Sequence, residues 1–306
     1  MTITLVENFR AVFYAPFYVA HALEAYRDEG LDVRLKTSDS PGPTAGGLSS
    51  GEAGVWWGGP MRLLVARDQD PDCGLVGFCE VVTRDPFFVV GRTPRADFQL
   101  PDLADLVIGT VSEVPTPWMC LQDDIRRAGL DPERVERVTD KSMDDNAASL
   151  RGGTLDAIQV FEPFVEQLVR EGAGHIWYAA ASRGPTSYTT LYTERRTLDE
   201  MPDTALAMTR AIYRTQKWIW KHGAAMVAET IAEYFPELDV ETLGACIRRY
   251  QALGIWGGDP FLPKDGFERL KDGLLSGGLI RRSADYRDCV DTSLAEAVIA
   301  ANPLSM

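Results

Sequence analysis

The segment FYAPFYVAHALEAYRDEGLDVRL (residues 13–35) reads as a helix followed by a strand. Pro16 suits the first turn of a helix, where a missing N–H removes no hydrogen bond, and Gly30 suits the helix end. Apolar and polar residues alternate over 31–36, which is typical of a strand. We therefore expect a unit in which an apolar strand, a short loop, a proline and an amphipathic helix follow one another.

This unit recurs at four prolines, which are Pro16, Pro60, Pro117 and Pro163. The first two lie 44 residues apart and the last two lie 46 apart, with 57 residues between the pairs. The paired spacing predicts two similar halves. Further strands are expected at residues 31–36, 106–111, 134–138 and 157–161. Because strands alternate with helices, we expect two small parallel sheets.

Two segments, 74–91 and 187–193, read as extended strands without an intervening helix, and we expect them to connect the halves. The second half is then an insertion. Residues 88–185 form one lobe, and residues 1–87 together with 186–306 form the other. After residue 197 the helical pattern continues to the end of the chain, and these helices are expected to pack on the first lobe. The predicted fold class is α/β with two lobes.

The composition excludes several classes of protein. Hydrophobic residues make up 45% of the 306 residues and charged residues 25%, so the chain can bury a core and is not disordered. With 31 basic and 45 acidic residues the net charge is −14, which argues against nucleic acid as a partner. No apolar run approaches the roughly 18 residues of a membrane-spanning helix, so we expect that this chain is not an integral membrane protein.

The five cysteines and three histidines lack the spacing of metal ligands, and we predict neither a metal site nor a cofactor. The first 30 residues have no basic stretch before an apolar run, so they contain no recognisable export signal and predict a cytoplasmic location. The nucleophile elbow, the phosphate-binding loop and the dinucleotide fingerprint are missing from the sequence. Cys120 is expected to be a core thiol. We therefore predict no catalytic residue.

The loops that precede the four prolines are rich in aromatic and hydrogen-bonding residues. In open α/β sheets, ligands bind beyond the carboxyl ends of the strands, where helix N-termini offer N–H groups. We therefore predict that the loops converge on one cleft. The predicted ligand contacts are Asn8, Phe9, Arg10, Tyr14, Trp57, Gly58, Gly59, Ser112, Glu113, Thr116, Trp118, Phe161, Glu162, Arg183 and Tyr188.

Several of these residues have a structural alternative. Trp57 follows another tryptophan, and neighbours in a strand face opposite ways, so one of the two belongs to the core. Glu113 and Glu162 can be first-turn carboxylates that the helix dipole stabilises. Arg183 can clamp a carboxylate, a sulfonate or a phosphate, or it can pair with an acid of this chain. The same two alternatives hold for Arg10 and Arg62.

Four stretches together resemble a known family: FYAPFYVAHALEAYRDEGLDVRL, LSSGEAGVWWGGPMRLL, LVIGTVSEVPTPW and LRGGTLDAIQVFEPF. The family is the NMT1/THI5-like, or SsuA/THI5-like, group of periplasmic-binding-protein-like solute receptors, whose ligands include sulfonates, nitrate, taurine and pyrimidines. The resemblance covers roughly residues 1–220. It implies a type II binding fold that closes by hinge bending, and it adds Ser38 to the ligand contacts. It also implies a periplasmic location.

The leading hypothesis is a solute-binding protein of an ABC-type importer, with a small anionic or (hetero)aromatic molecule as its ligand and a membrane permease as its partner. The alternative is a cytoplasmic enzyme on the same scaffold, acting on a pyrimidine precursor or an aromatic sulfinate or carboxylate, with Glu113, Glu162 or Cys120 in the chemistry. The sulfinate desulfinases of this scaffold use a cysteine in the first loop, whereas residues 9–16 contain none. The cysteine-rich motif of the pyrimidine synthases also has no counterpart. A ligand sensor that presents its closed form to a partner is a third possibility.

Overall fold

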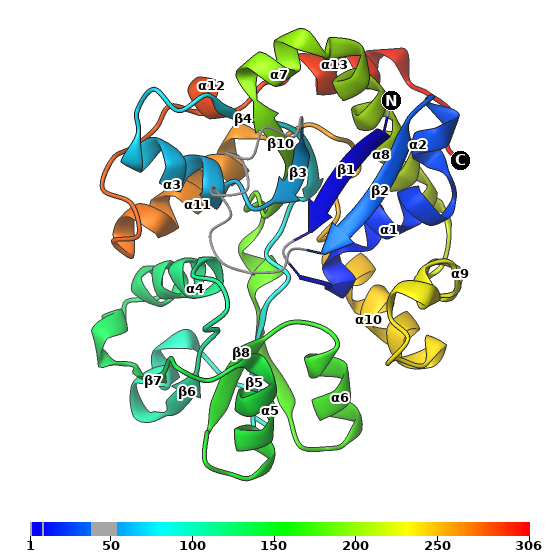
Figure 1. Ribbon diagram of the computed structural model, residues 1–306. Helices are drawn as coiled ribbons and strands as arrows, with labels where there is room; N and C mark the ends of the chain where they lie inside the picture. Colours follow the sequence, from blue (N-terminus) through cyan, green and yellow to red (C-terminus); the bar gives the residue numbers. More distant parts are fainter. Residues whose placement is uncertain (1, 8, 38–53) are drawn as a thin grey trace.

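In the computed structural model, residues 2–7, 9–37 and 54–306 are described, and their strands form two mixed five-stranded sheets (Figure 1). The first sheet has the order β2-β1-β3-β10-β4 and the second has the order β7-β6-β8-β5-β9. The strands of the first sheet are β1 (Thr2–Glu7), β2 (Asp32–Thr37), β3 (Val55–Gly58), β4 (Leu75–Val82) and β10 (Thr189–Glu194). Those of the second are β5 (Phe88–Gly91), β6 (Val107–Gly109), β7 (Glu136–Val138), β8 (Ala157–Val160) and β9 (His175–Ala179).

The two sheets repeat one topology. In the first, β1 pairs in parallel with β2 and β3, and β10 runs antiparallel to both β3 and β4. In the second, β6 pairs in parallel with β7 and β8, and β5 runs antiparallel to both β8 and β9. The sheets are therefore mixed, and the expectation of two parallel sheets was wrong. The reason is that β5 and β10 come directly from the connecting segments and enter each sheet against the direction of its parallel strands.

The chain passes between the sheets twice, once from β4 to β5 and once from β9 to β10. The two connecting segments, residues 83–87 and 180–188, run side by side, since the Thr186 N–H donates to the Thr83 carbonyl and the Tyr188 N–H donates to the Val82 carbonyl. The lobe boundaries at 87/88 and 185/186 stay a prediction of the sequence.

Helices flank both sheets. Before β9 they are α1 (Ala15–Ala22), α2 (Ala25–Asp28), α3 (Met61–Gln69), α4 (Thr116–Arg127), α5 (Met143–Arg151) and α6 (Phe164–Arg170). After β10 they are α7 (Arg195–Glu200), α8 (Pro202–Lys221), α9 (Ala224–Ile231), α10 (Val240–Leu253), α11 (Lys264–Ser276), α12 (Tyr286–Cys289) and α13 (Ser293–Ala301). A 3-10 turn, η1 (Val12–Tyr14), precedes α1. The expected helical end of the chain is therefore confirmed.

All four prolines stand at the start of a helix, as predicted. Pro16 and Pro117 lie in the first turns of α1 and α4, and Pro60 and Pro163 immediately precede α3 and α6. Each helix follows a loop at the carboxyl end of a strand of the parallel core, namely β1, β3, β6 or β8. The four loops therefore lie at corresponding edges of the two sheets.

The C-terminal helices hold the two halves together. Helices α8 and α13 pack on β4, so they cover the first sheet. Helix α11 contacts α3 of the first half and α4 of the second, and α10 contacts η1 of the first half and α6 of the second. Figure 1 shows these two helices on opposite sides of the connecting segments. The halves are thus bridged on both flanks.

Candidate functional site

Residues of both halves line a small cavity of about 30 Å³. They come from the loop before α1, from the start of α3, from the loop before α4 and from the two connecting segments. The lining residues are Phe9, Phe13, Tyr14, Gly59, Met61, Arg62, Phe87, Val114, Thr116 and Tyr188. Three of the four predicted loops thus meet at one place.

The fourth loop reaches the same place through Phe161, the residue that follows β8. The Phe161 ring lies parallel to the Phe9 ring, with centroids 5.9 Å apart and planes 7° apart. It stands edge-on to Phe13 at 5.4 Å and to Phe87 at 5.1 Å. Aromatic side chains from both halves and one connecting segment therefore surround the cavity.

The lining includes five of the predicted ligand contacts, which are Phe9, Tyr14, Gly59, Thr116 and Tyr188. Gly59 has a steric reason to be glycine, because a Cβ atom there would lie 3.2 Å from the Tyr188 carbonyl oxygen. Gly58 is buried beside the Arg62 side chain. Asn8 and Ser38 lie outside the described residues. That these residues bind a ligand stays a prediction.

Among the described residues, neither of the two predicted tryptophans is in the lining of the cavity. Trp57 is 1% exposed and stacks on Phe17, with centroids 4.1 Å apart, so it is the core member of the tryptophan pair. Trp118 packs into a hydrophobic cluster beneath α4, and the Arg137 guanidinium lies 3.8 Å from its ring centroid. The aromatic residues of the described lining are phenylalanines and tyrosines, and a ligand contact at either tryptophan stays a prediction.

The predicted carboxylates serve the structure of the second half. The Met143 N–H, at the start of α5, donates to the Glu113 carboxylate at 2.9 Å, and the Ser112 hydroxyl donates to the Lys141 carbonyl. Glu162 accepts from the Glu166 N–H of α6 at 2.9 Å and pairs with Arg249 of α10. Glu113 and Glu162 thus follow the structural alternative, since each carboxylate accepts from an N–H group at the start of a helix. That Ser112 contacts a ligand stays a prediction.

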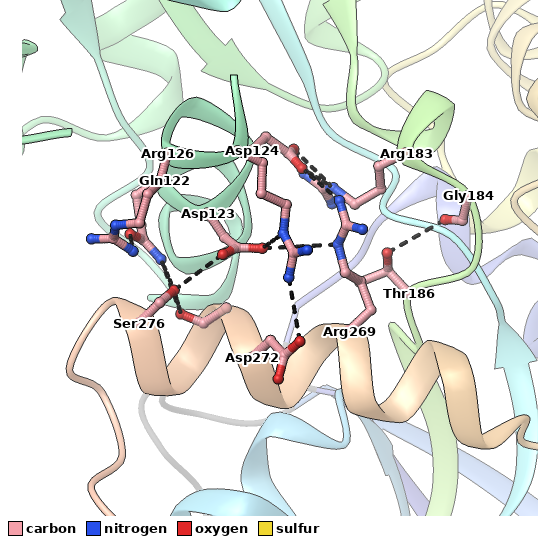
Figure 2. A network of polar contacts seen from close by, with 12 residues as sticks. Gln122, Asp123, Asp124, Arg126, Arg183, Gly184, Thr186, Arg269, Asp272 and Ser276 are labelled. Carbon is pink, nitrogen blue, oxygen red and sulfur yellow. Dashed lines mark hydrogen bonds and ion pairs between the residues drawn. The ribbon is translucent and has the colours of Figure 1, made fainter. Parts of the chain in front are cut away.

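The predicted arginines are also held by acids of this chain. Arg183 pairs with Asp85 at 2.6 Å, and its side chain is 3% exposed. It also pairs with Asp124 of α4 (Figure 2). Arg10 pairs with Glu7 at 2.8 Å and also donates to the Tyr234 carbonyl. We therefore expect no ligand anion at Arg183 or Arg10, because internal carboxylates already occupy their donors.

Five lining residues were missing from the predicted contacts: Phe13, Met61, Arg62, Phe87 and Val114. Phe13 and Val114 lie in the predicted loops, and Arg62 stands two residues after a helix-starting proline, which was a usable signal. Phe87 directly precedes the apolar strand β5 and looks like one more residue of that strand, so the sequence offers no sign of its position.

The two tyrosines that line the cavity stay uncharged at neutral pH. Burial raises the pKa of Tyr14 and of Tyr188, so both hydroxyls remain proton donors at neutral pH. Burial also raises the pKa of Cys120, which leaves this thiol protonated and a poor nucleophile. Among the residues that the structure describes, no three His, Cys, Asp or Glu side chains gather as metal ligands would.

A second, wider hollow of about 570 Å³ lies beside the connecting segments and has Glu80 in its lining. Glu80 is 2% exposed, and burial, with help from the charges of Asp259 and Asp265, raises its pKa to about 8. The folded state therefore holds a proton that the unfolded chain releases near pH 4.5. The folded protein should lose stability as the pH rises between these values, by about 1.4 kcal/mol per unit at most.

We expect Glu80→Gln to remove this loss, because glutamine stays neutral. Urea unfolding at pH 5.5 and 7.5 checks this. From pH 5.5 to 7.5 the free energy of unfolding of the original chain should fall by about 2 to 3 kcal/mol more than that of the variant. Glu237→Gln, at an exposed position, serves as the control. Equal pH dependence of the Glu80 variant and the original chain would contradict the burial argument.

The sequence and the fold of this chain are similar to those of known proteins. Over 298 residues the chain is 25% identical to YtlA of Bacillus subtilis (strain 168), which is named as a binding protein; the match covers 97% of this chain and 89% of YtlA. The periplasmic sulfonate-binding protein SsuA from Methylobacillus flagellatus KT has a TM-score of 0.77 at 14% identity, and the match covers 99% of this chain and 94% of that one. The desulfurization enzyme DSZB has a TM-score of 0.68 at 13% identity, with 99% of both chains covered.

These likenesses confirm the predicted fold, which is the two-sheet α/β fold of periplasmic-binding-protein-like structures. Within the described ranges, none of the helices is both long and apolar enough to cross a membrane. Residues 84–232 match the model of the NMT1-like family. The resemblance to the NMT1/THI5-like family that the four sequence stretches predicted is therefore confirmed.

Proposed function

We propose that this chain is the solute-binding protein of an ABC-type importer and captures a small anionic or (hetero)aromatic molecule between two lobes. The observation that carries the proposal is the cavity to which both halves and both connecting segments contribute. A ligand at this place touches both halves at once only when they are close together. It therefore favours the closed arrangement by its differential affinity.

The size of the cavity supports a hinge motion. About 30 Å³ is room for a single water molecule, whereas a cavity that holds benzene measures about 150 Å³. Entry of a ring or an organic anion therefore requires the halves to separate. The two connecting segments, which run side by side, are the natural place for that bending.

The relatives support the same proposal. YtlA is named as a binding protein, and the structures that share the fold include the alkanesulfonate-binding protein SsuA from Xanthomonas axonopodis pv. citri bound to MOPS. Under this proposal the partner is a membrane permease, and the chain itself carries out no reaction.

An enzyme on the same scaffold is the second candidate, because DSZB shares the fold and a variant of DSZB was solved in complex with biphenyl-2-sulfinic acid. Three residues were considered for chemistry in this chain. Glu113 and Glu162 hold helix starts, and Cys120 is a buried, protonated thiol. None of the three lines the cavity among the described residues, which favours the binding protein.

A thermal-shift screen with sulfonates, aromatic carboxylates and pyrimidines tests the proposal. We expect at least one probe to raise the melting temperature in a saturable manner. At a probe concentration of a hundred times the dissociation constant, the free energy of unfolding should rise by about 2.7 kcal/mol. Mass spectrometry should then recover the probe unchanged after incubation. Consumption of the probe would instead establish the enzyme, and the lack of saturable binding by any probe or co-purified molecule would overturn both candidates.

A further inference from the structure

The wider hollow that has Glu80 in its lining, here called the Glu80 hollow, is separate from the small cavity between the halves. Its volume is about 570 Å³, and within the described ranges the two spaces have no lining residue in common. Both connecting segments border it, the first through Thr83 and Arg84 and the second through Pro185. A hollow of this volume can hold a small organic molecule.

The Glu80 carboxyl group has unused hydrogen-bonding capacity. Glu80 lies in β4 and is 2% exposed, and its Oε1 atom accepts no hydrogen bond from the described part of the chain. Its backbone is fully bonded, since the N–H donates to the Pro260 carbonyl and the carbonyl accepts from Gln216. A buried oxygen without a donor is costly, so a ligand that brings a donor gains the full value of that bond.

A second buried group without a partner lies beside this carboxyl. The hydroxyls of Ser187 and Thr83 oppose the rise in the pKa of Glu80, so both are near its carboxyl. Ser187 Oγ is nevertheless buried without a hydrogen-bond partner among the described residues. An ammonium group carries three donors and no acceptor, so it can donate to the carboxyl and to this hydroxyl oxygen at once.

The charges around Glu80 favour a cation. Asp259 also lines the hollow, and Asp265 is near enough for its charge to act on Glu80. Arg84, a cation in the lining, donates to the Leu253 carbonyl at 3.1 Å, at the end of α10 where the helix dipole favours positive charge. A positively charged ligand would therefore relieve the repulsion among the three carboxyl groups.

The remaining walls of the hollow suit a carbon chain. Pro185, Phe261, Pro263 and Ile299 line it with apolar surface. Covering such surface is favourable by the hydrophobic effect, and the face of the Phe261 ring also attracts a cation. An organic cation with a short carbon chain matches this combination better than a bare inorganic ion does.

We propose that the Glu80 hollow is a second binding site, which takes a small alkylammonium ion. The ammonium group donates to the Glu80 carboxylate and to Ser187 Oγ, and the carbon chain packs on Phe261 and Ile299. On binding, the O–H bond of the Glu80 carboxyl breaks and its proton passes to the buffer, while the ammonium keeps its own protons. The proposal is independent of the proposed function, whose ligand lies in the other cavity.

Isothermal titration in phosphate buffer with butylammonium, 1-butanol and ammonium chloride tests the proposal. Because Glu80, with a pKa of about 8, must release its proton, the affinity for butylammonium should rise about 10- to 50-fold from pH 6 to pH 8. An alkylammonium stays charged throughout this range, as lysine does. At pH 8, 1-butanol should bind at least about 10-fold more weakly for lack of a charge, and ammonium about 10-fold more weakly for lack of a carbon chain.

Variants connect the binding to its residues. Glu80→Gln should weaken butylammonium binding about 10- to 100-fold at pH 8 and remove its dependence on pH. Ser187→Ala should weaken binding about 3- to 10-fold and keep the dependence on pH, because the carboxyl remains. Glu237→Gln removes an exposed carboxylate and is the matched control, which should bind as the original chain does.

Three results would each overturn the proposal: no saturable binding of butylammonium, an affinity that is equal at pH 6 and pH 8, or full affinity in Glu80→Gln. Equal binding of 1-butanol and butylammonium would overturn it as well. Circular dichroism checks that the variants fold, and if Glu80→Gln does not, the pH series and the comparison with 1-butanol on the original chain decide. The probes include no anion, sulfonate or aromatic ring as ligand, so their failure leaves the proposed function standing.

Discussion

Replacing Arg183 by methionine should lower the stability of the protein by about 3 to 5 kcal/mol, because it leaves the buried Asp85 carboxylate without a counter-charge. Asp85 is fully buried, and the Arg183 guanidinium is its ion-pair partner. Asp124 also accepts from the Nε atom of Arg183 at 2.8 Å. For a chain of this size the loss corresponds to a melting temperature lower by roughly 10 °C.

The position of Arg183 explains the size of the effect. Asp85 belongs to the first connecting segment, Arg183 to the second, and Asp124 to α4, so one guanidinium joins three elements. Figure 2 shows the contact between Arg183 and Asp124. Arg269 of α11 also reaches Asp124, at 3.3 Å. Loss of Arg183 therefore loosens the contact between the two connecting segments and their contact with α4, while Asp124 keeps Arg269.

Calorimetry of Arg183→Met and of Arg196→Met measures the difference. Arg196 pairs with Glu200 on the exposed surface of α7, and its loss should have little effect on the melting temperature. Asp85→Asn added to Arg183→Met should recover part of the stability, because the unpaired Asp85 charge is removed. Equal melting temperatures for the two single variants would show that the ion pair of Arg183 and Asp85 does not stabilise the fold.

The sequence predicted the fold well because its signals are local. A proline at a helix start and a glycine at a helix end act within one turn of chain, so Pro16, Pro60, Pro117 and Pro163 gave the helix starts directly. The antiparallel course of β5 and β10 was missed, since the direction of a strand depends on where the chain enters the sheet.

The site was harder to predict because a side chain's partner is set by tertiary contacts. Arg183 and Arg62 both follow prominent loop signals, yet Arg183 is held by two acids distant in sequence while Arg62 lines the cavity. Trp118 stands in a predicted loop region, but the first turn of α4 directs its ring toward Arg137. Residue type and loop position predicted where the site lies, and burial decided which side chains face it.

The ion pair between Arg249 and Glu162 should also make a large contribution to the stability of the folded chain. Glu162 is fully buried next to Phe161, and Arg249, on α10, also reaches Glu166 of α6 at 2.7 Å. Burial raises the pKa of Glu162, and the Arg249 charge opposes that rise. Arg249→Leu should therefore raise the pKa of Glu162 further and lower the stability at pH 8 by about 3 to 5 kcal/mol.

The pH dependence of this variant distinguishes a lost charge from lost packing. With a pKa above its unfolded value, Glu162 binds its proton more tightly in the folded state, so the folded variant gains stability as the pH falls from 8 toward 5. Urea unfolding should show most of the deficit at pH 8 and little at pH 5. Adding Glu162→Gln should make the deficit independent of pH, and Arg170→Leu, whose side chain is 39% exposed, should cost little at either value. A deficit that is the same at both pH values in Arg249→Leu would mean that α10 supports the second half by packing alone, and that the charge pair does not hold the halves together.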